Sequence, residues 1–267
     1  MKPRRQFAVG ILILVFLASL MANQLAPVSY SHQFRESANA PPSHEFPLGT
    51  DDLGRDRLSR LLYGSRISLL LAPVAALIAT ALAALVGGTA GYLGGWWERV
   101  GMGFSDLFMS LPWLFLLLTF RAMLPLNVSP LASVIITFTL LGLLGWAAAA
   151  RVVCAGARAL RNSEFVLQAR THGCGDFRLL IWHVLPPLKP VLYAQFWISI
   201  PVFILSEANL GVLGLGVAEP LPSWGNLLRD LENYRAALTS PWLLAPLFLL
   251  VLVVACFQTV LPEEDLP

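Results

Sequence analysis

Charged side chains are scarce in this sequence. Asp, Glu, Lys and Arg make up 13% of the chain, while apolar residues make up 57%. A soluble domain needs roughly 25% charged residues to cover its surface, and one soluble core could not hide this much apolar area. Lipid must therefore surround most of the chain. The net charge of +2 and the lack of a basic cluster with interleaved aromatics exclude a nucleic-acid partner.

Lysine, cysteine and catalytic motifs are equally sparse. The chain has two lysines, Lys2 and Lys189, and neither lies in the Gly-Lys-Ser/Thr sequence of a nucleotide-binding loop. No Gly-x-Ser-x-Gly or His-Glu-x-x-His sequence occurs. Cys154, Cys174 and Cys256 lack paired spacing, so neither a disulfide framework nor a zinc site is indicated. We therefore expect no catalytic residue, metal or cofactor, and any ATP hydrolysis must occur on another polypeptide.

Long uncharged runs predict an all-α membrane protein. A helix needs about 20 apolar residues to cross the hydrocarbon core, and the runs are continuous rather than alternating, which favours helices over barrel strands. Gly87, Gly88, Gly91, Gly94 and Gly95 on the second span predict close helix packing. The six expected spans are 7–25, 67–93, 101–125, 131–150, 190–210 and 241–261.

The distribution of Lys and Arg predicts the orientation of these spans. Basic residues gather before the first span and in segment 151–189, and six crossings place both on the cytoplasmic side, together with a short acidic tail at 262–267. The opposite segment, 27–63, also carries four arginines, balanced by five acids, and Arg66 follows it. Residues 1–26 are predicted to be a retained transmembrane anchor, because the span is long enough to cross the membrane. A cleaved signal peptide is the less favoured alternative, since it also has a basic start and an apolar stretch.

Three ionisable residues lie within or near the spans. Asp106, Arg121 and Glu207 all fall near predicted span ends. Such groups are functional candidates, but side chains at span ends can also extend to the interface, and we favour that explanation over a substrate contact. Pro112 predicts a kink in the third span.

Segment 151–189 is the longest polar connection on the predicted cytoplasmic side. Asn162 or Ser163 can cap a helix whose first turn holds Glu164. Three apolar residues of this helix fall on one side at helical spacing, namely Phe165, Val166 and Ala169.

A second short helix is expected after a glycine stop at Gly173. Asp176 can cap it, and Pro186 and Pro187 are expected to close it. An ordinary solvated loop is the plain alternative. Connections longer than about 15 residues nevertheless usually carry function, and a short amphipathic helix suits a groove on a partner protein.

The stretch from Glu164 to Gly173, followed by the sequence HVLP at 183–186, resembles the EAA loop of ABC importer permeases. Leu167 and Gln168 stand where that family usually has Glu and Ala. The resemblance implies a coupling helix that docks on the ATPase subunit through segment 162–186. The residues to which it assigns this coupling are Glu164, Phe165, Ala169, Gly173, Asp176 and Pro186.

Further motifs narrow the resemblance to the C-type permeases of dipeptide, oligopeptide and nickel importers. They are PLGTDDLGRD at 47–56, GSRISL at 64–69, AGYLGGW at 90–96, LGLGV at 213–217 and PSWGN at 222–226. The resemblance implies a type I importer permease bundle whose core spans 64–261. It also implies a second permease as heterodimer partner, two ATP-binding subunits and a periplasmic solute-binding protein. An ion-coupled secondary transporter is the alternative, and a membrane enzyme is a third hypothesis.

Overall fold

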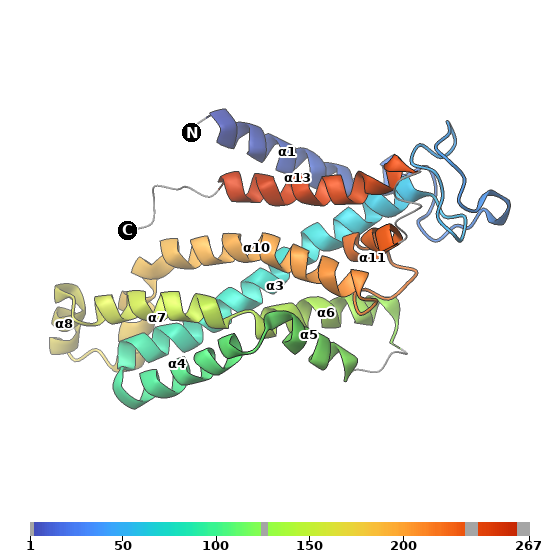
Figure 1. Ribbon diagram of the computed structural model, residues 1–267. Helices are drawn as coiled ribbons and strands as arrows, with labels where there is room; N and C mark the ends of the chain where they lie inside the picture. Colours follow the sequence, from blue (N-terminus) through green and yellow to red (C-terminus); the bar gives the residue numbers. More distant parts are fainter. Residues whose placement is uncertain (1–2, 124–127, 233–239, 261–267) are drawn as a thin grey trace. The chain divides into compact units, whose positions relative to one another are not determined.

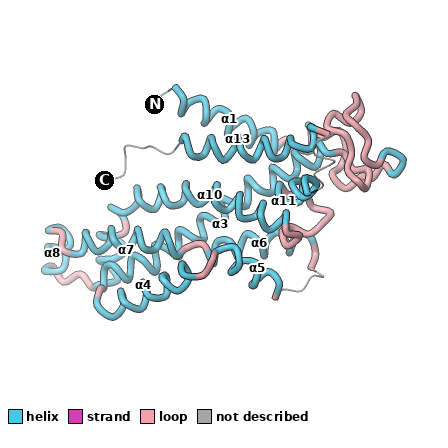
Figure 2. Tube along the Cα trace, viewed as in Figure 1, coloured by secondary structure: helices cyan, strands magenta, loops and turns pink. Residues whose placement is uncertain are grey.

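The computed structural model describes residues 3–123, 128–232 and 240–260. Over these ranges the chain is helical and contains no strand, apart from an isolated antiparallel bridge between Thr50 and Asp56 (Figures 1 and 2). The all-α prediction is therefore confirmed. The predicted acidic tail at 262–267 lies outside the described residues.

The chain divides into two compact units. Unit 1 consists of residues up to Ala72, Arg121–Phe138 and residues from Pro201 onward. Unit 2 consists of Pro73–Phe120 and Thr139–Ile200. Three long helices contribute residues to both units: α3 (Arg57–Leu93), α6 (Pro130–Leu144) and α10 (Lys189–Val212).

In unit 1, α1 (Pro3–Leu20) packs along α13 (Ala245–Val260), as Figures 1 and 2 show. Between α1 and α3 lie α2 (Ala22–Leu25) and the 3₁₀ turn η1 (Arg35–Ser37). The polar segment after α10 holds α11 (Trp224–Leu228) and η4 (Arg229–Glu232), and η5 (Pro241–Leu244) leads into α13. Helix α11 contacts α13.

Unit 2 contains α4 (Gly95–Ser110), which packs against α7 (Ala147–Arg161), and most of α5 (Trp113–Ala122). The short helices α8 (Glu164–Thr171) and α9 (Asp176–Leu179) follow α7. A π-helical turn, η2 (Leu180–Val184), and a 3₁₀ turn, η3 (Pro186–Leu188), then join α9 to α10.

The spans match the predicted number, because five described helical stretches are long and apolar enough to cross a membrane and a bent pair raises the total to six. The bent pair is α4 and α5, which meet at 88° around Pro112, so the predicted kink is a complete break of the span. The second span begins at Arg57 rather than at residue 67. Asp56 caps this helix, because its carboxylate accepts hydrogen bonds from the backbone N–H and hydroxyl of Ser59 at 2.8 and 2.6 Å.

Close packing of α3 against α7 depends on the predicted glycines. A Cβ added at Gly87 would lie 2.2 Å from the carbonyl oxygen of Ala150, and one at Gly91 would lie 2.3 Å from that of Cys154. Gly94 and Gly95 adopt φ angles of +67° and +58° and form the turn from α3 into α4. Left-handed backbone of this kind is the conformation that favours glycine. A Cβ at Gly94 would still lie 2.1 Å from Nη1 of Arg161 in α7, whereas one at Gly95 would meet no atom within 4 Å, so the packing prediction is wrong for Gly95.

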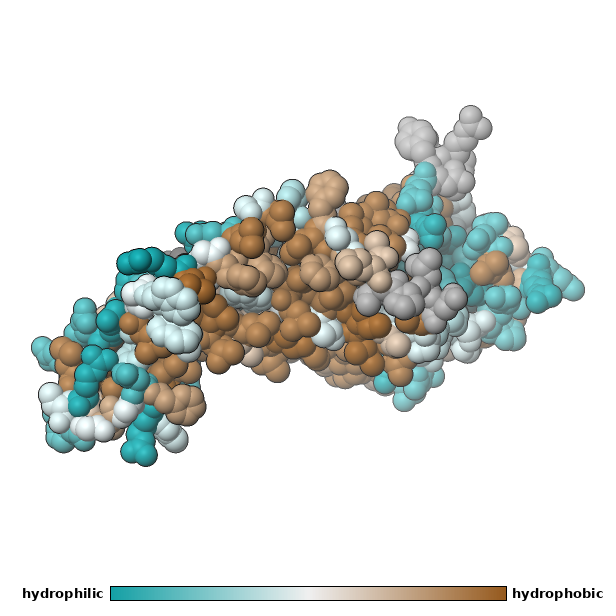
Figure 3. Space-filling view, turned by 90° about the horizontal axis from the view of Figure 1, so that it is seen from below, coloured by the Kyte–Doolittle hydropathy of each residue, from teal (hydrophilic) through white to brown (hydrophobic). Residues whose placement is uncertain are grey.

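Large apolar side chains remain exposed on the long helices. Examples on five different helices are Leu14, Leu77, Leu131, Val202 and Phe248. In Figure 3, apolar side chains cover much of the visible helical surface, while hydrophilic ones gather over segment 27–56 and over α8. Exposed apolar area on this scale is typical of a surface that faces lipid.

Candidate functional site

The connection between α7 and α10 in unit 2 forms a hairpin of two short helices, α8 and α9. Helix α7 continues to Arg161 rather than ending at 150, and helical backbone resumes at Asp176 and runs to Val212, so only residues 162–175 join these two stretches. Ser163 is the N-cap of α8 as predicted, but its hydroxyl donates to the Leu160 carbonyl at 2.6 Å instead of capping the helix. Glu164 lies in the first turn of α8, where a negative charge complements the helix dipole.

Gly173 ends α8, as the sequence predicts. Its φ is +80°, its N–H donates to the Arg170 carbonyl at 3.0 Å, and the Cys174 N–H donates to the Ala169 carbonyl at 3.2 Å. These two bonds and the left-handed residue constitute a Schellman motif. The spacing of Ala169 and Gly173 in the sequence therefore has a direct structural reason.

The predicted apolar side of α8 is only partly correct. Val166 is completely buried and Ala169 is half-buried, but Phe165 is 42% exposed and Leu167 is 45% exposed. One residue corresponds to a turn of about 100° on a helix, so Phe165 and Val166 point in different directions. The hairpin thus presents Phe165 and Leu167 outward, and Phe177 of α9 is also exposed.

A polar cluster ties both short helices to the end of α3. The Tyr92 hydroxyl donates to Asp176 Oδ1 at 2.8 Å, and Arg170 Nη2 donates to the Tyr92 oxygen at 3.0 Å. Arg170 also lies over the Tyr92 ring, 5.8 Å from its centroid, which is within cation–π range. Asp176 was expected to cap α9, but Gly175 occupies the N-cap position and the Asp176 carboxylate binds this cluster instead.

Sequence reasoning missed the roles of Tyr92 and Arg170. Tyr92 is 1% exposed and lies in the 90–96 motif, which provided the only available signal. The structure brings Glu164, Phe165, Ala169 and Gly173 together in α8 and its end, and Asp176 follows them in α9.

Pro186 is not part of the hairpin and does not close its second helix. Helical backbone continues from Asp176 to Val212. In a regular helix, Pro186 would clash with the carbonyl four residues earlier. The π-helical turn before it, with Leu185 N–H bonded to the Leu180 carbonyl at 2.9 Å, widens the backbone at that point.

The expectation that ionisable groups near span ends extend to the interface is wrong for two of the three residues. Glu207 is 0% exposed; the Ser68 hydroxyl donates to its Oε2 at 3.4 Å, and its Oε1 has no hydrogen-bond partner among the described residues. Arg121 is 7% exposed and donates to carbonyl groups of the chain. Only Asp106 fits the expectation, since its carboxylate is exposed and accepts from Arg151 Nη1 at 2.6 Å.

The described residues contain no group of three or more His, Cys, Asp or Glu side chains that could hold a metal ion. What they contain is a set of spans with exposed apolar side chains, a close-packed helix pair and an anchored hairpin that exposes Phe165, Leu167 and Phe177 among polar side chains. These features define a multi-pass membrane protein of the transport-permease class.

The chain belongs to the family of binding-protein-dependent transport system inner membrane components, whose family model matches residues 83–262. It is 32% identical over 250 residues to the dipeptide transport system permease protein DppC of Bacillus subtilis, a match that covers 93% of this chain and 76% of the relative. It is also 32% identical to the oligopeptide transport system permease protein OppC of Mycobacterium tuberculosis, over 92% of this chain and 82% of the relative. It is 32% identical to the glutathione transport system permease protein GsiD of Escherichia coli, over 82% of this chain and 70% of the relative.

Family membership makes this chain a multi-pass inner-membrane permease subunit of an ABC importer rather than an enzyme. It implies a partnership with an ATPase and a binding protein. The predicted permease function is confirmed, and the comparisons support it over the ion-coupled secondary transporter.

Proposed function

We propose that this chain is one of two different permease subunits in a peptide importer that also contains two ATP-binding subunits and a periplasmic solute-binding protein. Relatives named for transport of dipeptides, oligopeptides and glutathione support a peptide cargo. The chain would then line half of the translocation pathway across the lipid bilayer.

The observation that carries the coupling role is the α8–α9 hairpin of unit 2. An exposed Phe165 and Leu167 on a short helix suit an apolar groove on a partner protein. Val166 and the Schellman motif at Gly173 hold the hairpin in one conformation. We assign ATPase docking to the exposed face that includes Glu164 and Phe165. Ala169, Gly173 and Asp176 shape the hairpin, and Pro186 shapes the entry to α10.

In this proposal the hairpin transmits movement of the ATPase to the spans. ATP binding closes the ATPase dimer and displaces α8, and the Arg170–Tyr92–Asp176 cluster passes that displacement to the end of α3. The pathway then opens outward to receive solute from the binding protein, and hydrolysis resets it. ATP can drive this cycle only by stabilising one conformation over the other.

The orientation follows from the position of the hairpin. An ATPase acts in the cytoplasm, so α8, the N-terminus and the C-terminus lie there, while segment 27–63 and the connection after α10 lie in the periplasm. Contacts within each unit support the assignment of the two ends of α3 to opposite sides of the membrane. The start of α3 contacts the connection after α10 through Arg57 and Asp230, and its end contacts α8 and α9 through Tyr92.

Cysteine labelling tests this orientation. In a variant whose native cysteines are all replaced by alanine, Gly175→Cys should react with a membrane-impermeant maleimide in inside-out vesicles and not in intact cells. Gly175 suits the purpose because it is exposed and a Cβ there meets no atom within 4 Å. Labelling in intact cells would refute the assignment of the hairpin to the ATPase.

Docking itself is tested by the double substitution Phe165→Asp and Leu167→Asp. We expect this variant to assemble with the second permease but to lose co-purification of the ATPase, because two charges would have to be buried in an apolar groove. The matched control, Ser31→Asp with Gln33→Asp, adds the same charge at exposed positions of segment 27–63 and should retain the ATPase. Retention of the ATPase and of transport by the first variant would contradict the proposal.

A further inference from the structure

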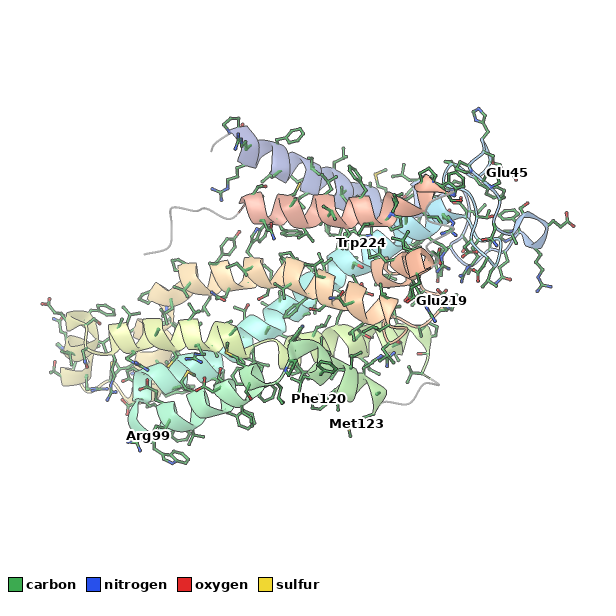
Figure 4. The ribbon with its side chains drawn as sticks, viewed as in Figure 1. Glu45, Arg99, Phe120, Met123, Glu219 and Trp224 are labelled. Atoms are coloured by element: carbon green, nitrogen blue, oxygen red, sulfur yellow. The ribbon has the colours of Figure 1, made fainter. Side chains whose placement is uncertain are left out.

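Unit 1 contains a polar cavity of about 960 Å³. Its described walls come from segment 39–60, from Arg121, and from residues 214–232 and 240–243 after α10. This volume lies in the range of small-molecule sites, roughly 300–1,000 Å³. Glu219, labelled in Figure 4, belongs to this lining.

Most of the buried charged side chains in the cavity wall form ion pairs. Arg55 binds Asp51 at 2.6 Å and Glu219 at 2.7 Å, and Arg60 binds the other oxygen of Glu219 at 2.8 Å. Arg57 pairs with Asp230. Burial raises the pKa of Asp230 above its ordinary value, while the Arg57 guanidinium acts in the opposite direction. These ion pairs hold the cavity walls together, and their charged groups bind one another rather than a ligand.

Arg121 differs from the other arginines of the cavity. It is 7% exposed, and no ion pair joins it to a carboxylate among the described residues. Its Nε donates to the Leu215 carbonyl at 2.8 Å, and its Nη2 donates to Ser133 Oγ at 2.7 Å and to the Gly216 carbonyl at 3.2 Å. Nη1 has no hydrogen-bond partner in the part of the chain that the structure describes.

A guanidinium carries five N–H donors. The three bonds to Leu215, Ser133 and Gly216 account for Nε and Nη2, so both N–H groups of Nη1 remain unsatisfied. All three acceptors are formally neutral. A buried charge is costly unless it is both paired and hydrogen-bonded, so the two N–H groups of Nη1 favour an anionic acceptor.

A second guanidinium lies close to the same turn. Gly214 has a φ of +74°, and a Cβ added there would lie 3.7 Å from Cζ of Arg229, whose side chain is exposed. Arg121 and Arg229 therefore both lie beside the turn 214–216, one buried and one exposed, and both line the cavity. Two such groups favour a ligand carboxylate, because Arg forms short, charge-assisted bonds with carboxylate oxygens.

We propose that the cavity binds a carboxylate of the transported solute, with Arg121 as the buried ligand-binding residue and Arg229 as its exposed partner. This inference rests on the proposed peptide cargo, since every unblocked peptide ends in a carboxylate. The carboxylate of a peptide in the cavity supplies a negative charge and accepts hydrogen bonds from the two N–H groups of Arg121 Nη1.

The test uses the complete importer in nanodiscs, without binding protein, and two probes that differ in one group: trialanine and trialanine amide. Thermal unfolding of the complex is followed against the concentration of each probe. Wild type should require about ten- to hundred-fold less trialanine than amide for half-maximal stabilisation, because hydrogen bonds to charged groups contribute about 1.5–3 kcal/mol. Arg121→Gln should abolish this preference, Arg121→Lys should retain part of it, and Arg229→Gln should reduce it.

The control Arg35→Gln removes an exposed arginine outside the cavity and should preserve the preference. The proposal is overturned if wild type does not distinguish the probes, if neither probe stabilises it, or if Arg121→Gln weakens both equally. The last result would show that Arg121 only positions the turn 214–216. Co-purification of the ATPase is measured in the same preparations, so a wild-type importer that retains the ATPase but shows no carboxylate preference would refute this site and leave the importer proposal intact.

Discussion

Replacing Gly173 with serine should loosen the α8–α9 hairpin. Gly173 has φ +80°, and a Cβ there would meet no atom within 4 Å, so the substitution introduces no steric clash with neighbours. Its cost comes from the left-handed backbone, about 1–2 kcal/mol for a residue with a Cβ. That cost corresponds to roughly a 5- to 30-fold larger population of hairpins with a broken Schellman motif.

Hydrogen exchange measures this effect directly. The amides of residue 173 and Cys174 donate the two bonds of the motif, so both should exchange about 5- to 30-fold faster in the complete importer, in proportion to the open population. If the hairpin couples ATP hydrolysis to transport, the amount of solute imported per ATP should fall as well. Gly173→Asn should have a smaller effect, because Asn tolerates the left-handed region better than other non-glycine residues.

Gly175→Ser is the matched control. Gly175 has φ −69° and ψ 155°, is the N-cap of α9, and a Cβ there also meets no atom within 4 Å. Serine is a favourable N-cap residue, so this variant should keep wild-type exchange and coupling. Equal exchange rates in the Gly173→Ser variant and wild type would refute the assignment of hairpin rigidity to this glycine.

Three further substitutions test other contacts of the fold. Tyr92→Phe removes two hydrogen bonds, one donated to Asp176 and one accepted from Arg170, so it should cost about 1–3 kcal/mol and raise amide exchange in α8 and α9 in proportion. Ser65→Ala should lower the unfolding temperature, because the fully buried Trp224 (Figure 4) would lose the acceptor 2.9 Å from its indole nitrogen, an effect of about 1–3 kcal/mol. Gly91→Ala should destabilise the protein by about 1–3 kcal/mol through overpacking, whereas Gly103→Ala, in open space, should be neutral or stabilising in the same thermal unfolding measurement.

Uncharged runs in the sequence located the spans but misplaced several of their ends, among them the end of the fourth span and the start of the second. Helix α7 extends past Arg151 because its opposite side is apolar, with Val153, Cys154 and Ala157 buried. Because the buried side of α7 supplies the packing, the arginines on its exposed side do not end the helix, and it continues into a polar environment. Helix α3 begins before the uncharged run because Asp56 caps it. A criterion based on charge alone cannot detect either effect.

The hairpin could be predicted from local signals, because Gly173 and the first turn of α8 depend on neighbouring residues. The buried charges could not. Whether Arg121 reaches the interface depends on the turn 214–216, almost a hundred positions away in sequence, whose carbonyls accept its hydrogen bonds. Contacts of that range are set by tertiary packing, which hydrophobic periodicity does not report.

The packing of unit 2 explains why a displacement of α8 would reach the membrane spans. Gly87 and Gly91 let α3 approach the backbone of α7 over consecutive turns, and close-packed helices of this kind resist relative sliding. Helix α8 follows α7 directly, and Arg170 and Asp176 bind Tyr92 at the end of α3. The hairpin is therefore attached to both members of one rigid helix pair. A force on the exposed face of α8 would move that pair as a body, because bending the hairpin alone would first break the Schellman motif and the Tyr92 cluster.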